Sequence, residues 1–322
     1  MIHRIPSGTR DVLPDEMREL RALTERTRAV FQAAGYGEVY TPTLEYEGTI
    51  ERAGMTATRP AYRMFDDQGH VLVLRSDMTV PIARLVATRY AQAELPLRFS
   101  YFAHAYRGVR PQRGQSRELL QAGVELIGAA GPEGTAEALS VLCAALDAAG
   151  LRTYRVGVGD ASLYPALLES VGVPGAQRDL ILEELVGGDF VGVERELRAL
   201  GLPAGETELL LGVPRMRGGA EVLDRLRGPL AQAGTGMRAL HALLSPAVAE
   251  RVIFDFGLVR SLGYYTGAVF QVYDPAHGVP IGSGGRYDEL LGRFGRALPA
   301  VGFALNVERL HIALTGEERG EL

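Results

Sequence analysis

The stretch from Asp255 to Asp288, DFGLVRSLGYYTGAVFQVYDPAHGVPIGSGGRYD, decides the fold that we predict for this chain. Two strand-like runs, 252–259 and 268–273, lie on either side of Arg260 and a pair of tyrosines. A glycine-rich segment at 282–285 is expected to form a turn before the final Arg-Tyr-Asp. The alternation of β-branched or aromatic residues with polar ones, interrupted by glycine, predicts neighbouring antiparallel strands.

The polar residues of this stretch are compatible with two interpretations. Strands of this kind would place the guanidinium of Arg260, the phenols of Tyr264, Tyr265 and Tyr287 and a carboxylate at the ends of one sheet. A small zwitterion such as an amino acid could be held there. The same residues also fit an ordinary tyrosine-rich hairpin pair with surface charges, because short motifs carry a risk of false positives.

The composition is that of a globular protein with many tight turns. The chain has 322 residues, and its 40 glycines amount to about 12% where about 7% is usual. No apolar run reaches the roughly 20 residues of a membrane span, and the N-terminal residues lack the hydrophobic core of a signal peptide. We therefore expect a cytoplasmic protein without membrane contact.

Several classes of chemistry are excluded or disfavoured by residue content. The single cysteine, Cys143, lies in an apolar helical pattern, so disulfides are absent and a buried hydrophobe is expected there. The six histidines form no i, i+4 pair, so we expect no metal. The sequence contains no lysine, which excludes a lysine Schiff base and a Walker-type phosphate loop. The net charge of −5 gives no overall basic field for nucleic acid.

The order of elements predicts an α+β fold with an inserted helical block. Strand and helix patterns fill 1–160 and 251–322, whereas 161–250 is rich in Leu and Ala and divided by Gly and Pro. We predict one core from the two outer segments and a helical insertion subdomain from the middle one.

Three further groups are candidates for binding. Asp77 and Thr79 precede a helix, where a carboxylate most often serves only as an N-cap. Gln121 and Glu125 fall on one face of a predicted strand. The arginine-rich loop that follows Arg107 could grip an anion, or it could be a solvated loop.

Taken together, six segments in one order resemble the catalytic core of class II histidyl-tRNA synthetases. They are GTRDVLP, YTPTLE, YRGVRPQRGQSRELLQ, VRSLGYYTG, GGRYDELL and VGFALNVERL, and the likeness covers nearly the whole chain. The resemblance implies an antiparallel sheet flanked by helices, with a helical insertion.

The sequence departs from that family in the nucleotide half of the site. Val109 stands where the family has a glutamate that helps hold ATP, and Gln115 matches an arginine. Asn306 replaces a glycine of the third motif, and Gly263 replaces an aspartate. Valine cannot accept a hydrogen bond and asparagine adds bulk, so the resemblance implies impaired ATP contacts.

The amino-acid half is better preserved. The resemblance implies that Asp77 and Thr79 face the ligand's α-amino group, with Arg107 and Gln121 on its carboxylate side. It further implies that the imidazole pocket and its reacting edge are formed by Glu125, Arg260, Tyr264, Tyr265 and Tyr287.

A synthetase-like core with these changes, and without room for an anticodon-binding domain, resembles the regulatory subunits of ATP phosphoribosyltransferase. That family implies a non-catalytic subunit without cofactors or bound tRNA. It is expected to form a homodimer within a larger complex with the short catalytic subunit, to activate that subunit, and to take part in its inhibition by L-histidine. Two alternatives stay open: a truncated ligase that forms histidyl-adenylate, using Arg107, Arg260 and Arg309, and a histidine-binding module for another partner.

Overall fold

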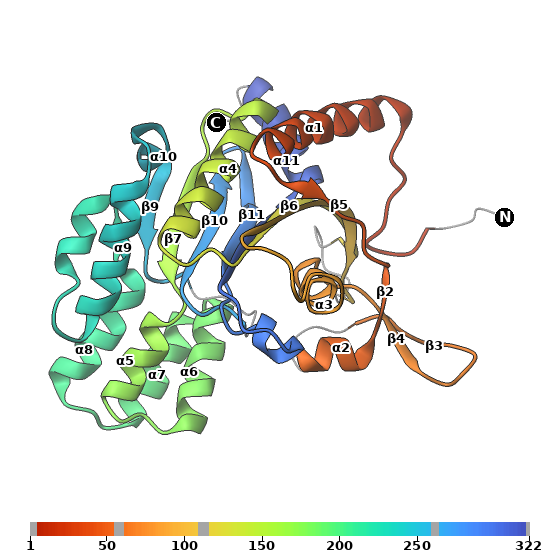
Figure 1. The fold of residues 1–322 in the computed structure, drawn as a ribbon. Helices are drawn as coiled ribbons and strands as arrows, with labels where there is room; N and C mark the ends of the chain where they lie inside the picture. The colour runs from red at the N-terminus through yellow and green to blue at the C-terminus, as the bar shows by residue number, and fades with distance from the viewer. Residues whose placement is uncertain (1–4, 55–60, 109–115, 259–263, 320–322) are drawn as a thin grey trace.

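The fold is built on one large sheet, whose strands lie side by side across the centre of Figure 1, from β9 to β5. The structure is a computed structural model that describes residues 5–54, 61–108, 116–258 and 264–319. Within these ranges the large sheet contains, in spatial order, β1 (Gly37–Glu38), β5 (Leu97–Tyr106), β6 (Glu118–Ile127), β12 (Ala300–Asn306), β11 (His277–Arg286), β10 (Ala268–Asp274), β7 (Arg155–Asp160), β9 (Val252–Asp255) and β8 (Arg217–Gly218).

A small second sheet lies beside it, with the order β2 (Leu44–Tyr46), β4 (Val71–Leu74) and β3 (Arg63–Phe65). All pairings in the small sheet are antiparallel. The hairpin turn predicted between β3 and β4 is present, and the Asp66 carboxylate accepts from the backbone N–H groups of Gln68 and His70 there.

Helices cover both faces of the large sheet. One face packs against α1 (Pro14–Ala33), α4 (Glu133–Ala149) and α11 (Val307–Arg319), which lie together in the upper part of Figure 1. The opposite face carries α3 (Thr79–Arg89), α2 (Glu47–Arg52) and the 3-10 helix η4 (Leu291–Phe294). Two apolar clusters result, one on each face.

Local sequence explains the helix boundaries. Pro14 occupies the first turn of α1, where a missing N–H costs nothing. Leu20, Leu23 and Phe31 recur at helical spacing and are buried. Gly150 ends α4 with φ 108°, a left-handed conformation that favours glycine.

The segment between β7 and β9 is mainly helical, as the Leu- and Ala-rich pattern predicts. It contains the short strand β8 and α5 (Leu163–Ser170), α6 (Gly175–Gly187), α7 (Phe190–Ala199), α8 (Ala204–Gly212), η1 (Val213–Arg215), η2 (Ala220–Arg225), η3 (Gly228–Leu230), α9 (Ala231–Leu243) and α10 (Pro246–Arg251). Its buried side chains belong to the same apolar cluster as those between the large sheet and helices α1 and α4.

The predicted α+β fold is confirmed, and most pairs of the large sheet are antiparallel, with β1 parallel to β5 and β7 parallel to β9 as exceptions. Two predictions about its strands need correction. The strands β9 and β10 are not neighbours, since β7 lies between them. Residues 282–285 are not a turn but part of β11.

These glycines serve close packing rather than chain reversal. A Cβ on Gly284 would lie 2.2 Å from the carbonyl oxygen of Gly302 and 2.6 Å from the ring of Phe270. A Cβ on Gly285 would lie 2.8 Å from the ring of Tyr265. Only glycine lets β11 pass between these groups.

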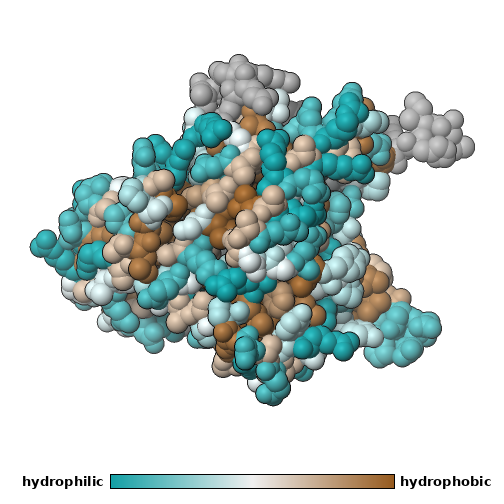
Figure 2. All heavy atoms as spheres, turned by 45° about the horizontal axis from the view of Figure 1, so that its top comes forward, coloured by the Kyte–Doolittle hydropathy of each residue, from teal (hydrophilic) through white to brown (hydrophobic). Residues whose placement is uncertain are grey.

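The exterior mixes polar and apolar residues. On the side seen in Figure 2, hydrophobic areas are interrupted by hydrophilic side chains. Within the described part of the chain, none of the helices has the length and apolar character needed to cross a lipid bilayer.

Candidate functional site

A cavity lies on the α3 side of the large sheet, between β6, β11 and β12. Its volume is about 50 Å³, against about 150 Å³ for an engineered apolar cavity that takes benzene. A ligand the size of an amino acid would therefore need the lining to move or would extend from its mouth. Seven predicted binding residues contribute to its lining: Asp77, Thr79, Arg107, Gln121, Tyr264, Tyr265 and Tyr287.

Of the two remaining predicted residues, one lies behind the lining and one lies outside the described residues. Glu125 does not line the cavity, but it bonds two residues that do. Arg260 and Gly263 fall in the range 259–263, which is outside the described part of the chain. Val109 and Gln115 fall in the range 109–115, which is also outside it.

Glu125 is the most deeply buried acid of the site. It is 1% exposed, accepts a hydrogen bond of 2.7 Å from the Thr79 hydroxyl and accepts a short one from the Tyr287 hydroxyl. Burial raises the pKa of the Glu125 carboxyl to about 8, although the two hydrogen bonds oppose the shift and nearby Asp77 adds to it. At neutral pH this carboxyl is therefore largely protonated.

Asp77 both caps a helix and borders the cavity. Its Oδ1 accepts the backbone N–H of Val80 at 3.0 Å, which caps the first turn of α3 as the more ordinary reading predicts. The residue also lines the cavity, and the hydroxyl of Ser76 donates to Oδ2 at 3.3 Å. Capping thus fixes an acid at the edge of the site.

Tyrosine rings form an aromatic side of the cavity. Tyr264 lies 5.9 Å from Tyr287 in an edge-to-face arrangement and 5.0 Å from Tyr265, measured between ring centroids. Burial raises the pKa of the phenols of Tyr264, Tyr287 and Tyr101 well above the ordinary value. These phenols therefore remain protonated at physiological pH, and those of Tyr287 and Tyr101 donate to Glu125 and to the carbonyl oxygen of Phe303.

Gln121 presents an unpaired acceptor at the cavity. Its side chain is 8% exposed and lines the cavity, and its Oε1 has no hydrogen-bond partner among the described residues. A buried amide oxygen without a donor costs free energy, so buried polar atoms are normally paired. A ligand N–H would satisfy it.

The arginine retained from the third synthetase motif is engaged elsewhere. Arg309 donates to the carbonyl oxygen of Pro280 at 2.8 Å and does not line the cavity. Asn306, which replaces the family's glycine, accepts the backbone N–H of Arg309 at 2.9 Å and so caps α11. The change to asparagine therefore has a local structural use.

The prediction missed six residues that line the cavity, namely Met78, Tyr101, Ser283, Gly302, Phe303 and Ala304. Tyr101 could have been found from the alternation of LRFSYFAHA, which places it on the same face as Phe99. Gly302 carried no such signal, because its position depends on its pairing with Glu125 across β12 and β6. No cluster of three or more metal-ligating side chains occurs among the residues that the structure places.

The family model of histidyl-tRNA synthetases matches residues 8–310. An ATP phosphoribosyltransferase regulatory subunit of Symbiobacterium thermophilum is 43% identical over 326 residues, covering 99% of this chain and 81% of the relative. One from Desulforamulus reducens is 39% identical over 317 residues, covering 97% of this chain and 79% of the relative.

Solved structures agree with these relatives. A Bacillus halodurans protein described as an ATP phosphoribosyltransferase regulatory subunit/histidyl-tRNA synthetase superposes with a TM-score of 0.89 at 34% identity, over 97% of this chain and 84% of that one. A histidyl-tRNA synthetase from Nostoc, at 21% identity and a TM-score of 0.82, covers 100% of this chain and 77% of its own and supports the fold alone. The family model, the relatives and the solved structure from Bacillus halodurans therefore place this chain in the histidyl-tRNA synthetase-like family of ATP phosphoribosyltransferase regulatory subunits.

Proposed function

We propose that this chain activates the short catalytic subunit of ATP phosphoribosyltransferase and takes part in its inhibition by L-histidine, in the first step of histidine biosynthesis. The observation that carries the proposal is the division of the inherited site. Seven predicted amino-acid contacts converge on one cavity, whereas Arg309 of the nucleotide half donates to a backbone carbonyl. The names of the relatives support the same role.

We propose L-histidine as the ligand of the cavity, because the groups around it match the polar atoms of that amino acid. Asp77 is an acceptor for an ammonium group, and Arg107 is a cation for a carboxylate. The Thr79 and Tyr287 hydroxyls, held from behind by Glu125, and the unpartnered oxygen of Gln121 offer sites for ring nitrogens and N–H donors.

Inhibition would work by linkage between two states of the complex. If histidine binds the less active state better, it shifts the population toward that state by no more than its differential affinity. A coupling of about 1 to 3 kcal/mol is typical of such effectors and corresponds to roughly 5- to 150-fold.

The direct test is formation of phosphoribosyl-ATP by the short catalytic subunit of the same organism, measured with and without this chain and with added histidine. We expect stimulation by the chain and reversal by histidine. A matched variant, Glu125→Gln, should still stimulate but should need more histidine for reversal, because a protonated acid is replaced by an amide with a different donor pattern. Absence of stimulation would refute the activating role.

We also propose that the chain has no ligase activity of its own. The bond from Arg309 to Pro280 supports this, since it directs one N–H of that guanidinium, which an adenylating enzyme would use on ATP, to a backbone carbonyl. Histidine-dependent exchange of pyrophosphate into ATP should stay at background with high protein and magnesium. Exchange above background would instead establish the truncated-ligase alternative.

A homodimeric unit within the complex is our proposal for assembly. Three large side chains of the small sheet, Leu44 and Tyr46 on β2 and Phe65 on β3, are 41%, 55% and 75% exposed and leave apolar area that a partner could cover. Light scattering on the purified chain should give twice the monomer mass. A monomeric mass at all concentrations would contradict the proposal.

A further inference from the structure

Arg75 is a buried cation outside the cavity that the binding scheme does not use. Its side chain is 3% exposed, and none of the carboxylates that the structure places forms an ion pair with it. Burial lowers the pKa of its guanidinium. A charge buried in this way is tolerated only when its donors are satisfied, so each of its bonds is of structural interest.

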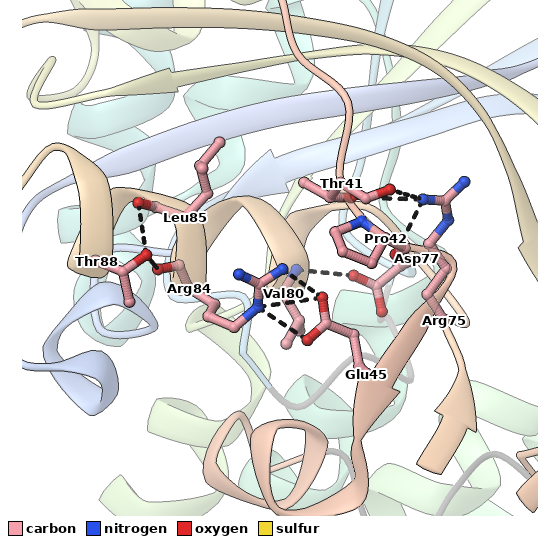
Figure 3. Close-up of polar contacts among 9 residues, drawn as sticks. All are labelled: Thr41, Pro42, Glu45, Arg75, Asp77, Val80, Arg84, Leu85 and Thr88. Carbon is pink, nitrogen blue, oxygen red and sulfur yellow. Dashed lines mark hydrogen bonds and ion pairs between the residues drawn. The ribbon is translucent and has the colours of Figure 1, made fainter. Parts of the chain in front are cut away.

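The side chain of Arg75 joins two separate segments through backbone carbonyls. Nε donates to His104 O at 2.8 Å, near the end of β5. Nη1 donates to Thr41 O at 2.7 Å and to Pro42 O at 3.2 Å, in the connection that leads into β2. Figure 3 shows the guanidinium directed at Thr41 and Pro42, with Asp77 close by at the start of α3.

The backbone of Arg75 also connects the 41–43 segment with the end of β5. The N–H of Arg75 donates to Thr43 O at 3.0 Å, and the N–H of Tyr106 donates to Arg75 O at 2.8 Å. Both the backbone and the side chain of Arg75 therefore lie between the 41–43 segment and the end of β5.

Arg75 itself and its attachment at the end of β5 are close in sequence to residues of the cavity. Asp77 and Thr79 follow Arg75 by two and four residues, and Arg107 follows Tyr106 directly. These three residues line the cavity on its acidic and basic sides. The separation between the two sides therefore depends on how Arg75 is held.

From this arrangement we propose that Arg75 is a positioning residue for the ligand cavity, holding Asp77 and Thr79 at a fixed separation from Arg107. The inference rests on the proposed histidine site and specifies how it is kept in shape. Arginine suits the task because its planar group presents several N–H donors in fixed directions, whereas the ammonium of lysine is a compact point charge.

The test compares Arg75→Lys and Arg75→Met with Arg84→Met. Arg84 makes a bidentate ion pair with Glu45 and so connects α3 with β2, close to the 41–43 segment. Arg84 does not line the cavity. Figure 3 places this ion pair on the side of α3 that faces β2, apart from the bonds of Arg75. Each variant is checked for folding by its melting temperature, and its affinity for L-histidine is measured by calorimetry well below that temperature.

We expect histidine affinity to fall about tenfold in Arg75→Lys and further in Arg75→Met, and to stay within about twofold of wild type in Arg84→Met, although that variant melts earlier. Histidine inhibition of the complex should weaken in parallel, while activation without histidine is retained. If Arg75→Met does not fold, the lysine variant decides.

Two results would overturn the inference, and they differ from failure of the proposed function. Unchanged affinity in folded Arg75 variants, or an equal loss in Arg84→Met, would show that Arg75 has no special role in positioning. Failure of the wild-type chain to bind histidine would remove the ligand itself, and the inference with it.

Discussion

Gly302 lies directly opposite Glu125 in the ladder between β12 and β6, and a Cβ placed on Gly302 would fall 1.8 Å from Oε2 of that carboxyl. The acid of the site thus occupies the space that any other residue at 302 would fill. The carbonyl of Val124 is also near, at 2.6 Å, so the backbone blocks a simple shift of the new side chain.

Gly302→Ala should therefore destabilise the protein and displace Glu125. We expect the free energy of unfolding to fall by about 1 to 3 kcal/mol, the usual cost of overpacking, as measured by urea denaturation. The matched control is Gly278→Ala in β11, where a Cβ meets nothing within 4 Å. Similar losses in the two variants would contradict the close contact.

The raised pKa of Glu125 predicts a pH dependence of stability. Between its ordinary value of 4.5 and about 8, the folded protein retains a proton that the unfolded chain has lost. The stabilising contribution of the protonated acid is complete below pH 4.5 and declines as pH rises toward 8, with a slope of up to about 1.4 kcal/mol per pH unit.

Glu125→Gln should abolish this part of the slope, because the amide does not titrate. The measurement is the free energy of unfolding of both proteins from pH 5 to pH 8. Glu118→Gln, at an exposed position of the same strand, should leave the wild-type slope intact. Parallel curves for wild type and Glu125→Gln would show that this carboxyl does not hold the proton.

The ion pair between Glu45 and Arg84 should contribute measurably to stability. Glu45 is 5% exposed and accepts from both Nε and Nη2 of Arg84, at 2.9 and 2.7 Å for the nearer contacts. Replacing the acid by an amide leaves a half-buried guanidinium poorly paired, so Glu45→Gln should lose about 2 to 3 kcal/mol in chemical denaturation.

Glu47→Gln is the corresponding control, because Glu47 forms an ion pair with Arg63, whose side chain is well exposed. Exposed pairs contribute about 1 kcal/mol or less. An equal loss of unfolding free energy in Glu45→Gln and Glu47→Gln would mean that burial does not strengthen the ion pair between Glu45 and Arg84.

Cys143 should resist thiol reagents in the folded protein. It is buried in α4, and burial raises the pKa of its thiol to about 11, so little thiolate forms at neutral pH. We expect one thiol to react with Ellman's reagent in urea and almost none under native conditions, with the native rate following the unfolding equilibrium. Rapid reaction of the native chain would disagree with the buried position.

Much of the fold was predictable because it follows from short-range patterns. Pro14 and the apolar spacing after it predict α1, and the turn residues after Phe65 predict the hairpin of the small sheet. The prediction failed where strands had to be paired at long range. The segment 282–285 looks like a turn because glycine is common in turns, yet its glycines are needed for contact with strands far away in sequence.

The sequence by itself determined the residue types of the site, the absence of lysine and cysteine chemistry, and the family resemblance, because all of these are properties of order and composition. Only the tertiary structure decided that Gln121 faces a cavity with an unpartnered oxygen, that the Glu125 carboxyl lies against Gly302, and that Arg75 joins the 41–43 segment to the end of β5. The physical reason is that burial and cross-strand register arise from contacts between residues distant in the chain, and these contacts change the pKa and the hydrogen-bonding of groups whose sequence neighbours are ordinary.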